Sequence, residues 1–83
     1  MDNELLTACK IGLNIPVESE DFDDILEQKI GAVKRYMKRA GVTEENMDLA
    51  VIVLGVTDLW NTKAGEVKFS PVFDTLVVQL RGD

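Results

Sequence analysis

The feature that most constrains the fold is the run from Leu49 to Val56, which contains no polar side chain. In a chain of 83 residues, a run this apolar must be buried on most of its faces. The rest of the sequence holds too little apolar material for a second core, so the other segments are expected to pack around this one. We therefore predict one domain, spanning residues 1–83.

The apolar run fits either a buried strand or a helix. Its many β-branched residues favour a strand, but strands usually end after about 4–8 residues and this pattern continues to Trp60. Thr43 can cap a helix, and Glu44 follows it in the first turn, where the helix dipole favours negative charge. We predict a helix over residues 44–61, with a strand as the alternative, and we expect Gly55 to allow close packing of a neighbouring helix.

Residues 21–40 show the clearest amphipathic pattern in the sequence. Acidic residues gather at the start and basic residues at the end, an arrangement that complements the helix dipole. Ser19 or Asp21 can cap the start, and Gly41 is typical of a helix end. The apolar stripe consists of Phe22, Ile25, Leu26, Ile30, Val33, Met37 and Ala40.

Two shorter helices are predicted at the ends of the chain. Residues 3–12 carry apolar side chains near helical spacing. Ser70 followed by Pro71 is a strong helix start, which predicts a last helix over residues 71–81, with a strand over residues 75–80 as the alternative. The fold class is therefore all-α, a small bundle of about four helices with a loop or short hairpin before the last.

The predicted core combines the apolar faces of these helices. A chain this short buries only about 60% of its unfolded surface, so neighbouring subunits would help to stabilise it. The residues predicted to form the core are Phe22, Leu26, Ile30, Ile52, Val56, Leu59, Trp60, Phe73 and Leu76.

The segment before the last helix holds two apolar residues, Val67 and Phe69, which alternate with charged ones. Such residues in a loop either pack on the chain's own core or contact a partner. We include both in the predicted interface with a neighbouring subunit or another partner protein, together with Arg81 near the C-terminus. The alternative is that Phe69 folds back to cover Trp60.

The net charge of −6 disfavours binding of nucleic acid as a main role. The charges are segregated, since eight of the fifteen acidic residues lie within residues 1–27. A basic run follows, and subunits with such opposite ends can meet head to tail. Three interpretations of the basic run are open: a solvated helix end, a surface for an acidic neighbour, or a contact with nucleic acid. Its four members in the predicted interface are Lys34, Arg35, Lys38 and Arg39.

The sequence lacks recognisable catalytic chemistry. It has no histidine, no phosphate-binding glycine loop and no nucleophile elbow, so we predict neither an enzyme nor a cofactor or metal site. The single cysteine, Cys9, is expected to pack as a small apolar residue. No signal peptide and no apolar run of about 18 residues is present, so we expect a protein that assembles in the cytosol without contacting a membrane.

The order of the signals carries more information than any one of them. A short helix leads through an acidic linker into a long helix, an apolar helix and a last helix that begins at Ser-Pro. The positions that define this order are Lys10, Leu13, Ile15, Asp21, Asp23, Asp24, Leu26, Ile30, Ala32, Tyr36, Gly41, Leu59, Trp60, Asn61, Ser70, Pro71, Leu76, Leu80 and Arg81. From Leu5 to Arg81, the chain resembles the small head–tail connector (adaptor) proteins of tailed bacteriophages, often described as DNA-packaging proteins. It departs from their pattern in having Trp60 where tyrosine is more usual and in a short loop after Asn61.

The resemblance implies a structural role in the virion. Such proteins are helical bundles that form a ring of copies below the portal protein, extend the DNA channel and dock a stopper or tail-completion protein. DNA passes through the channel without being a ligand. The protein would be assembled in the cytoplasm of the host bacterium and reside at the head–tail junction. The alternative is a small helical transcription regulator or anti-host protein of a phage or mobile element.

Overall fold

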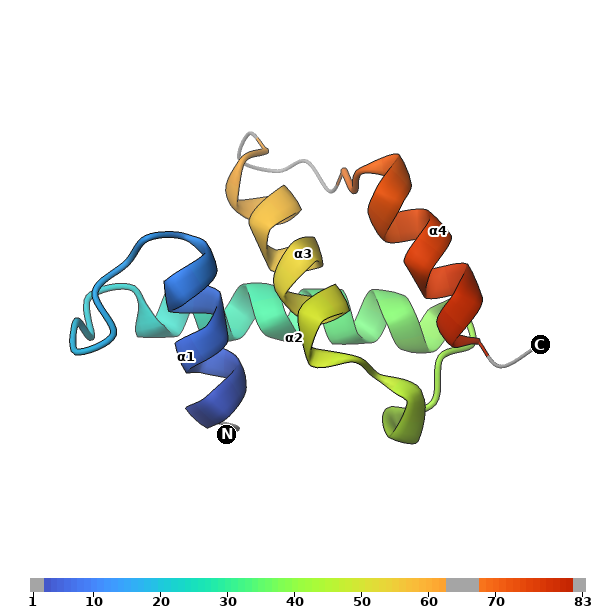
Figure 1. Cartoon of the computed structure of the whole chain (residues 1–83), viewed down its shortest axis with the longest axis horizontal. Helices are drawn as coiled ribbons and strands as arrows, with labels where there is room; N and C mark the ends of the chain where they lie inside the picture. The colour runs from blue at the N-terminus through green and yellow to red at the C-terminus, as the bar shows by residue number, and fades with distance from the viewer. Residues whose placement is uncertain (1–2, 63–67, 82–83) are drawn as a thin grey trace.

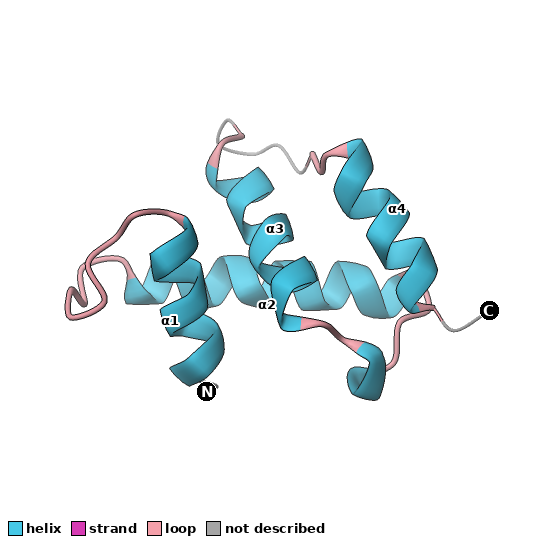
Figure 2. Ribbon diagram, in the orientation of Figure 1, coloured by secondary structure: helices cyan, strands magenta, loops and turns pink. Residues whose placement is uncertain are grey.

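The computed structural model describes residues 3–62 and 68–81, and within these ranges it contains four α-helices, one 3-10 turn and no strand (Figure 2). The predicted all-α fold is thus confirmed, and the strand alternatives for the apolar run and for residues 75–80 are wrong. The elements are α1 (Asn3–Gly12), α2 (Asp23–Arg39), η1 (Glu44–Asn46), α3 (Leu49–Trp60) and α4 (Pro71–Leu80).

The helices are arranged in two layers (Figure 1). The longest helix, α2, runs along the 39 Å dimension of the molecule, and the other three cross in front of it. Helix α3 lies in the middle of this front layer and contacts all three of the other helices, most extensively α2. Helices α1 and α4 flank it on opposite sides. The apolar run is therefore the centre of the fold, as the sequence predicts.

Helix α3 begins at Leu49, five residues later than predicted, because a different residue caps it. Asp48 is extended, and its Oδ1 accepts hydrogen bonds from the backbone N–H groups of Ala50 (2.8 Å) and Val51 (3.3 Å). The expected cap, Thr43, precedes only the short turn η1 and makes no capping hydrogen bond with its side chain. The extended backbone at Asp48 interrupts the helix that the acidic residues of η1 would otherwise start.

Helix α2 begins at Asp23 rather than at residue 21, and neither expected cap is used. Phe22 occupies the N-cap position without a capping side-chain hydrogen bond. Ser19 Oγ instead accepts a bond of 3.4 Å from the backbone N–H of Asp21, within the preceding turn. Because Phe22 precedes the helix, its side chain does not belong to the apolar stripe of α2.

Gly41 ends α2 as predicted, with a φ of 101° that other residues adopt only at a cost. Its N–H donates to the carbonyl of Lys38 (3.0 Å), and the N–H of Val42 donates to that of Met37 (2.9 Å). These two bonds form the Schellman motif, which satisfies carbonyls left open at the helix end. The motif also turns Val42 into the core, where it is 2% exposed.

The start of α4 is confirmed, and it is also tied to α3. Ser70 Oγ accepts a hydrogen bond of 3.2 Å from the backbone N–H of Phe73. Asp58 of α3 accepts two more bonds through Oδ2, from the N–H (3.0 Å) and the hydroxyl (2.9 Å) of Ser70. The cap of one helix is thus held by a side chain of its neighbour.

The core gathers between the two layers. Of the nine residues predicted for it, six are buried: Leu26, Ile30, Ile52, Val56, Leu59 and Phe73. Trp60 and Leu76 are only half-buried and pack against its edge. Phe22 is a correction, since it lies at the surface with its ring edge against Trp60, the ring centroids being 5.7 Å apart. The buried hydrophobic side chains absent from the predicted core list are Leu5, Cys9, Val33, Met37, Val42, Val51 and Val77.

Candidate functional site

The basic run lies in the last two turns of α2. Arg35, Lys38 and Arg39 are exposed, and Lys34 is half-buried. Lys38 Nζ pairs with Oε1 of Glu44 at 2.8 Å, which lowers the pKa of Glu44 through the hydrogen bond and the attraction of Lys38. Both partners are exposed, so the pair adds little stability. Within residues 3–62 and 68–81, the other three basic residues of the run form no ion pair.

The acidic segment lies at the opposite end of α2, as the direction of this helix along the molecule requires (Figure 1). Its exposed members flank the start of the helix and are Glu18, Glu20, Asp21 and Asp24. None of them forms an ion pair with another described residue. The structure therefore places unpaired charges of opposite sign at two separated ends of one rigid element.

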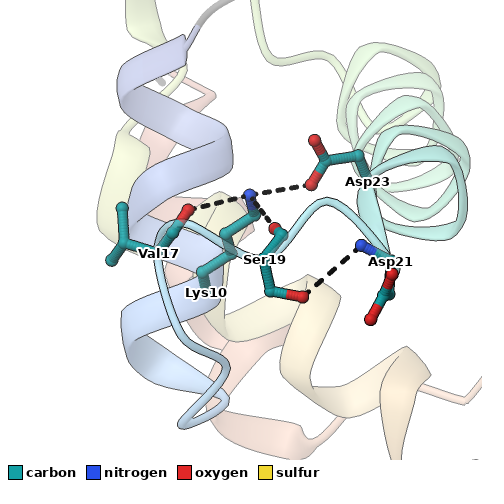
Figure 3. Close-up of polar contacts among 5 residues, drawn as sticks. All are labelled: Lys10, Val17, Ser19, Asp21 and Asp23. Carbon is teal, nitrogen blue, oxygen red and sulfur yellow. Dashed lines mark hydrogen bonds and ion pairs between the residues drawn. The ribbon is translucent and has the colours of Figure 1, made fainter.

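Lys10 holds the acidic end in place, a role that the sequence does not reveal. Its side chain is buried, and Nζ donates hydrogen bonds to the carbonyls of Ser19 (2.7 Å) and Val17 (3.2 Å) (Figure 3). The same ammonium pairs with Oδ1 of Asp23 at 2.8 Å. One cation thus ties α1, the connecting loop and the first turn of α2 together, and Asp23 is the one acid of this end that points inward.

Three residues that do not belong to α2 were also expected to contact a partner, and the outcome differs for each of them. Val67 lies outside the described residues. Arg81 is exposed just after α4, and a Cβ atom on Gly41 would lie 3.5 Å from its Nε, so it shares the end of the molecule that carries the basic run. Phe69 is half-buried against its own chain, and its contact with a partner stays a prediction. It also does not cover Trp60, the alternative that the sequence suggested.

Phe69 belongs to an aromatic cluster that joins α2 to α4. Its ring stacks on that of Phe73 with centroids 4.4 Å apart, and it lies 4.6 Å from the ring of Tyr36. Tyr36 Oη donates a hydrogen bond of 3.0 Å to Oδ1 of Asp74. That bond is the main reason why the pKa of Tyr36 is raised, and burial and the negative charge of Asp74 raise the same pKa further. The cluster is a structural joint, and Phe69 contributes to the contact between α2 and α4.

A pocket of about 170 Å³ opens where α1, α2, η1 and the start of α3 meet. Its lining is mixed, with four apolar residues and two charged ones. The residues that line it are Leu5, Lys34, Glu44, Met47, Leu49 and Ile52. Sequence reasoning missed the pocket because it predicted continuous helix over the segment where η1 and the extended residue Asp48 create it.

The described residues contain no group suited to metal binding, and no described helix has the length and apolar character needed to span a bilayer. Cys9 is fully buried on α1, and this burial raises the pKa of its thiol to about 11. The thiolate is the reactive form of cysteine, so Cys9 acts as packing in the folded protein. Comparison with protein-family models, with curated proteins and with solved structures gives no match.

Proposed function

We propose that this protein is a structural head–tail connector (adaptor) of a tailed bacteriophage, which forms a ring of copies below the portal, extends the DNA channel and docks a stopper or tail component. It acts by assembly and carries out no catalysis. The observation that carries the proposal is the separation of unpaired charge along α2, within the order of four helices that the resemblance implies.

Opposite charges at the two ends of one helix favour contact between successive copies. The acidic residues around the start of α2 can approach the basic run, Lys34 to Arg39, of the next copy. A pair of copies joined in this way still has a free basic end on one copy and a free acidic end on the other, so further copies can add. Contacts of this kind are heterologous, and they close into a ring when the rotation between copies permits. A net charge of −6 also suits a channel wall past which DNA must slide without binding.

The test is to mix the protein with the portal protein of the same phage and to image the particles by electron microscopy. We expect a ring of density on the portal. Replacing Lys34, Arg35, Lys38 and Arg39 with glutamate should abolish the ring while circular dichroism stays helical. Normal assembly of this variant would show that the basic run is only a solvated helix end, and absence of a ring with the unmodified protein would contradict the proposed function.

A matched variant separates charge complementarity from general damage. In it, the acidic residues of the other end are replaced by lysine, namely Glu18, Glu20, Asp21 and Asp24. Each variant alone has two ends of the same sign and should fail to assemble, whereas an equimolar mixture should recover rings because unlike ends meet again. A mixture that stays dispersed would contradict assembly through these ends.

The alternative function, a DNA-binding regulator, gives the opposite result in a simple measurement. Within residues 3–62 and 68–81, the basic helical surface suited to this role is the end of α2, and a recognition helix would have to insert that surface into a groove of DNA. Binding to random duplex DNA at low salt is the most permissive condition for such a protein. We expect no binding there, and binding that weakens steeply with salt would favour the regulator.

A further inference from the structure

The pocket between α1, α2 and α3 has the properties of a site for one apolar side chain. A closed and wholly apolar cavity of roughly 150 Å³ holds a molecule the size of benzene, which sets the scale for the volume. The present pocket, of about 170 Å³, is open and has Leu5, Ile52 and Leu49 in its apolar lining. It therefore has room for a single aliphatic or aromatic side chain from outside.

The charged side chains at the pocket leave an excess of positive charge. Glu44 is paired with Lys38 at 2.8 Å and is also attracted by Lys34, so two cations share one carboxylate. Lys34 is half-buried at the pocket and forms no ion pair with any residue that the structure describes. The side chain that suits this site is apolar and has a free carboxylate beside it.

Apart from Phe22, two exposed large apolar residues of the described chain directly adjoin an exposed acid that forms no ion pair with another described residue: Val17 precedes Glu18, and Ile25 follows Asp24. Phe22 also lies beside acidic residues, but its ring is already in contact with Trp60. Val17 lies in the turn between α1 and α2, whereas Ile25 is 45% exposed in the first turn of α2. Ile25 is therefore the better placed of the two, because the helix holds it and Asp24 in a fixed relation.

A molecule cannot fill its own pocket with Ile25. Ile25 and Lys34 are nine residues apart on the same straight helix, which separates them by about 13 Å along the axis and by about 180° around it. They flank the buried face of α2 on opposite sides, consistent with the burial of Leu26, Ile30 and Val33 between them. One copy thus presents the apolar side chain on one side and the pocket on the other.

From this geometry we infer that the pocket receives Ile25 of a second copy of the chain, with Asp24 of that copy pairing with Lys34. This inference rests on the proposed function, since it names the contact through which neighbouring copies assemble. The contact repeats from copy to copy because it uses different surfaces of the two partners. It also assigns a role to Ile25, which the predicted apolar stripe of α2 includes but which the structure leaves exposed.

The test isolates a single contact by using two variants that cannot self-associate through it. The ¹⁵N-labelled variant Ile25→Arg keeps the pocket and loses the inserting side chain. The unlabelled variant Lys34→Glu keeps Ile25 and Asp24 but repels them from its own pocket. Titrating the second into the first should produce saturating amide shifts confined to the pocket, at Leu49 and Ile52, whereas absence of these shifts, or shifts that centre on α4, would overturn the inference.

Two controls establish specificity. An unlabelled Lys34→Glu variant that also carries Ile25→Arg should produce at least tenfold smaller shifts at the same concentration. An unlabelled Lys34→Glu variant that carries Val78→Arg, a similar change at a residue 57% exposed on α4, should produce the same shifts as Lys34→Glu alone. Equal effects of the two changes would show that the shifts reflect general charge, and the inference would fail.

The ion pair has its own test by charge exchange. Unlabelled Asp24→Lys should not shift the pocket of the labelled Ile25→Arg variant, because two lysines then meet. It should shift the labelled double variant Ile25→Arg, Lys34→Asp, in which the charges are opposite again. If Asp24→Lys binds the labelled Ile25→Arg variant and does not bind the labelled double variant, the pairing of Asp24 with Lys34 is overturned.

None of these titrations uses the portal, so the two proposals can fail separately. Rings on the portal without pocket shifts would leave the connector function intact and remove this contact. Pocket shifts without rings on the portal would support the contact and contradict the connector function.

Discussion

Gly55 of α3 lies so close to the ring of Phe73 that a Cβ atom on Gly55 would be 2.6 Å from Cε1 of the ring. The same Cβ would be 2.9 Å from Cγ1 of Val33 on α2. The missing side chain therefore lets α3 approach both α2 and α4, as the sequence led us to expect. The contact accounts for a glycine in the middle of a helix, where it costs about 1 kcal/mol relative to alanine.

We predict that Gly55→Ala destabilises the protein by about 1–2 kcal/mol, because the cost of overpacking exceeds the gain in helix propensity. The control is Gly31→Ala, whose Cβ would meet only the flexible end of Arg35 at 3.3 Å. That change should be neutral or stabilising by up to about 1 kcal/mol. Urea unfolding of both variants measures the difference, and equal effects would refute the close packing at Gly55.

Replacement of Phe69 by alanine is expected to lower the melting temperature of the isolated protein. The ring stacks on Phe73 and contacts Tyr36, so its loss should cost about 1–3 kcal/mol, less than for a fully buried ring. The control, Val72→Ala, removes a side chain that is 61% exposed and should change stability by less than about 0.5 kcal/mol. A melting temperature unchanged by Phe69→Ala would favour a partner contact for Phe69 over a structural role.

Lys10→Met should destabilise the protein by about 2–3 kcal/mol, because it leaves the carboxylate of Asp23 and two loop carbonyls without their cation. Methionine keeps the apolar stem, so the loss reports the ammonium group. Lys38→Met breaks an ion pair of the same 2.8 Å length, but between exposed side chains, and should cost clearly less stability than Lys10→Met. Thermal unfolding measures both, and a smaller loss for Lys10→Met than for Lys38→Met would contradict the role of Lys10.

Tyr36 is the only tyrosine, so the phenolate absorbance of the whole protein reports its ionisation. We predict an apparent pKa above the ordinary value, because the hydrogen bond to Asp74 favours the neutral phenol. A raised pKa means that this bond stabilises the fold fully below about pH 10 and that its contribution is lost as the pH rises through the pKa of the folded state. Asp74→Asn should move the titration back toward the ordinary value, and an unchanged curve would show that the two groups are not coupled.

Sequence patterns predicted the helices well where local chemistry decides the outcome. Ser70 followed by Pro71 marks the start of α4, and Gly41 marks the end of α2, because each residue satisfies backbone groups within a few positions of itself. The predicted start of α3 was wrong because the sequence contains two capping signals that compete. Asp48 directly precedes the apolar run and caps it, but Thr43 and the acids after it offered an equally local alternative.

Features that depend on distant contacts could not be predicted. Lys10 gave no signal of burial, since its partners are two carbonyls of the following loop and one carboxylate of the next helix. Phe69 was read as a loop residue, and only the approach of α2 places Tyr36 beside it. The pocket arises from packing of four separate segments, so its lining has no pattern in the sequence.

The central position of α3 has a consequence for the order in which the protein folds. Helices α2 and α3 are consecutive in the chain and share the most extensive contact, so they can pair after closing only a short loop. We expect this pair to form the folding nucleus, with Ile52→Ala slowing folding and Cys9→Ala mainly accelerating unfolding, as stopped-flow fluorescence of Trp60 can measure. If Cys9→Ala slows folding to the same relative extent as Ile52→Ala, the nucleus also includes α1. With α2 and α3 alone as the nucleus, helix α1, which precedes this pair in the chain, would be among the last elements to take its place.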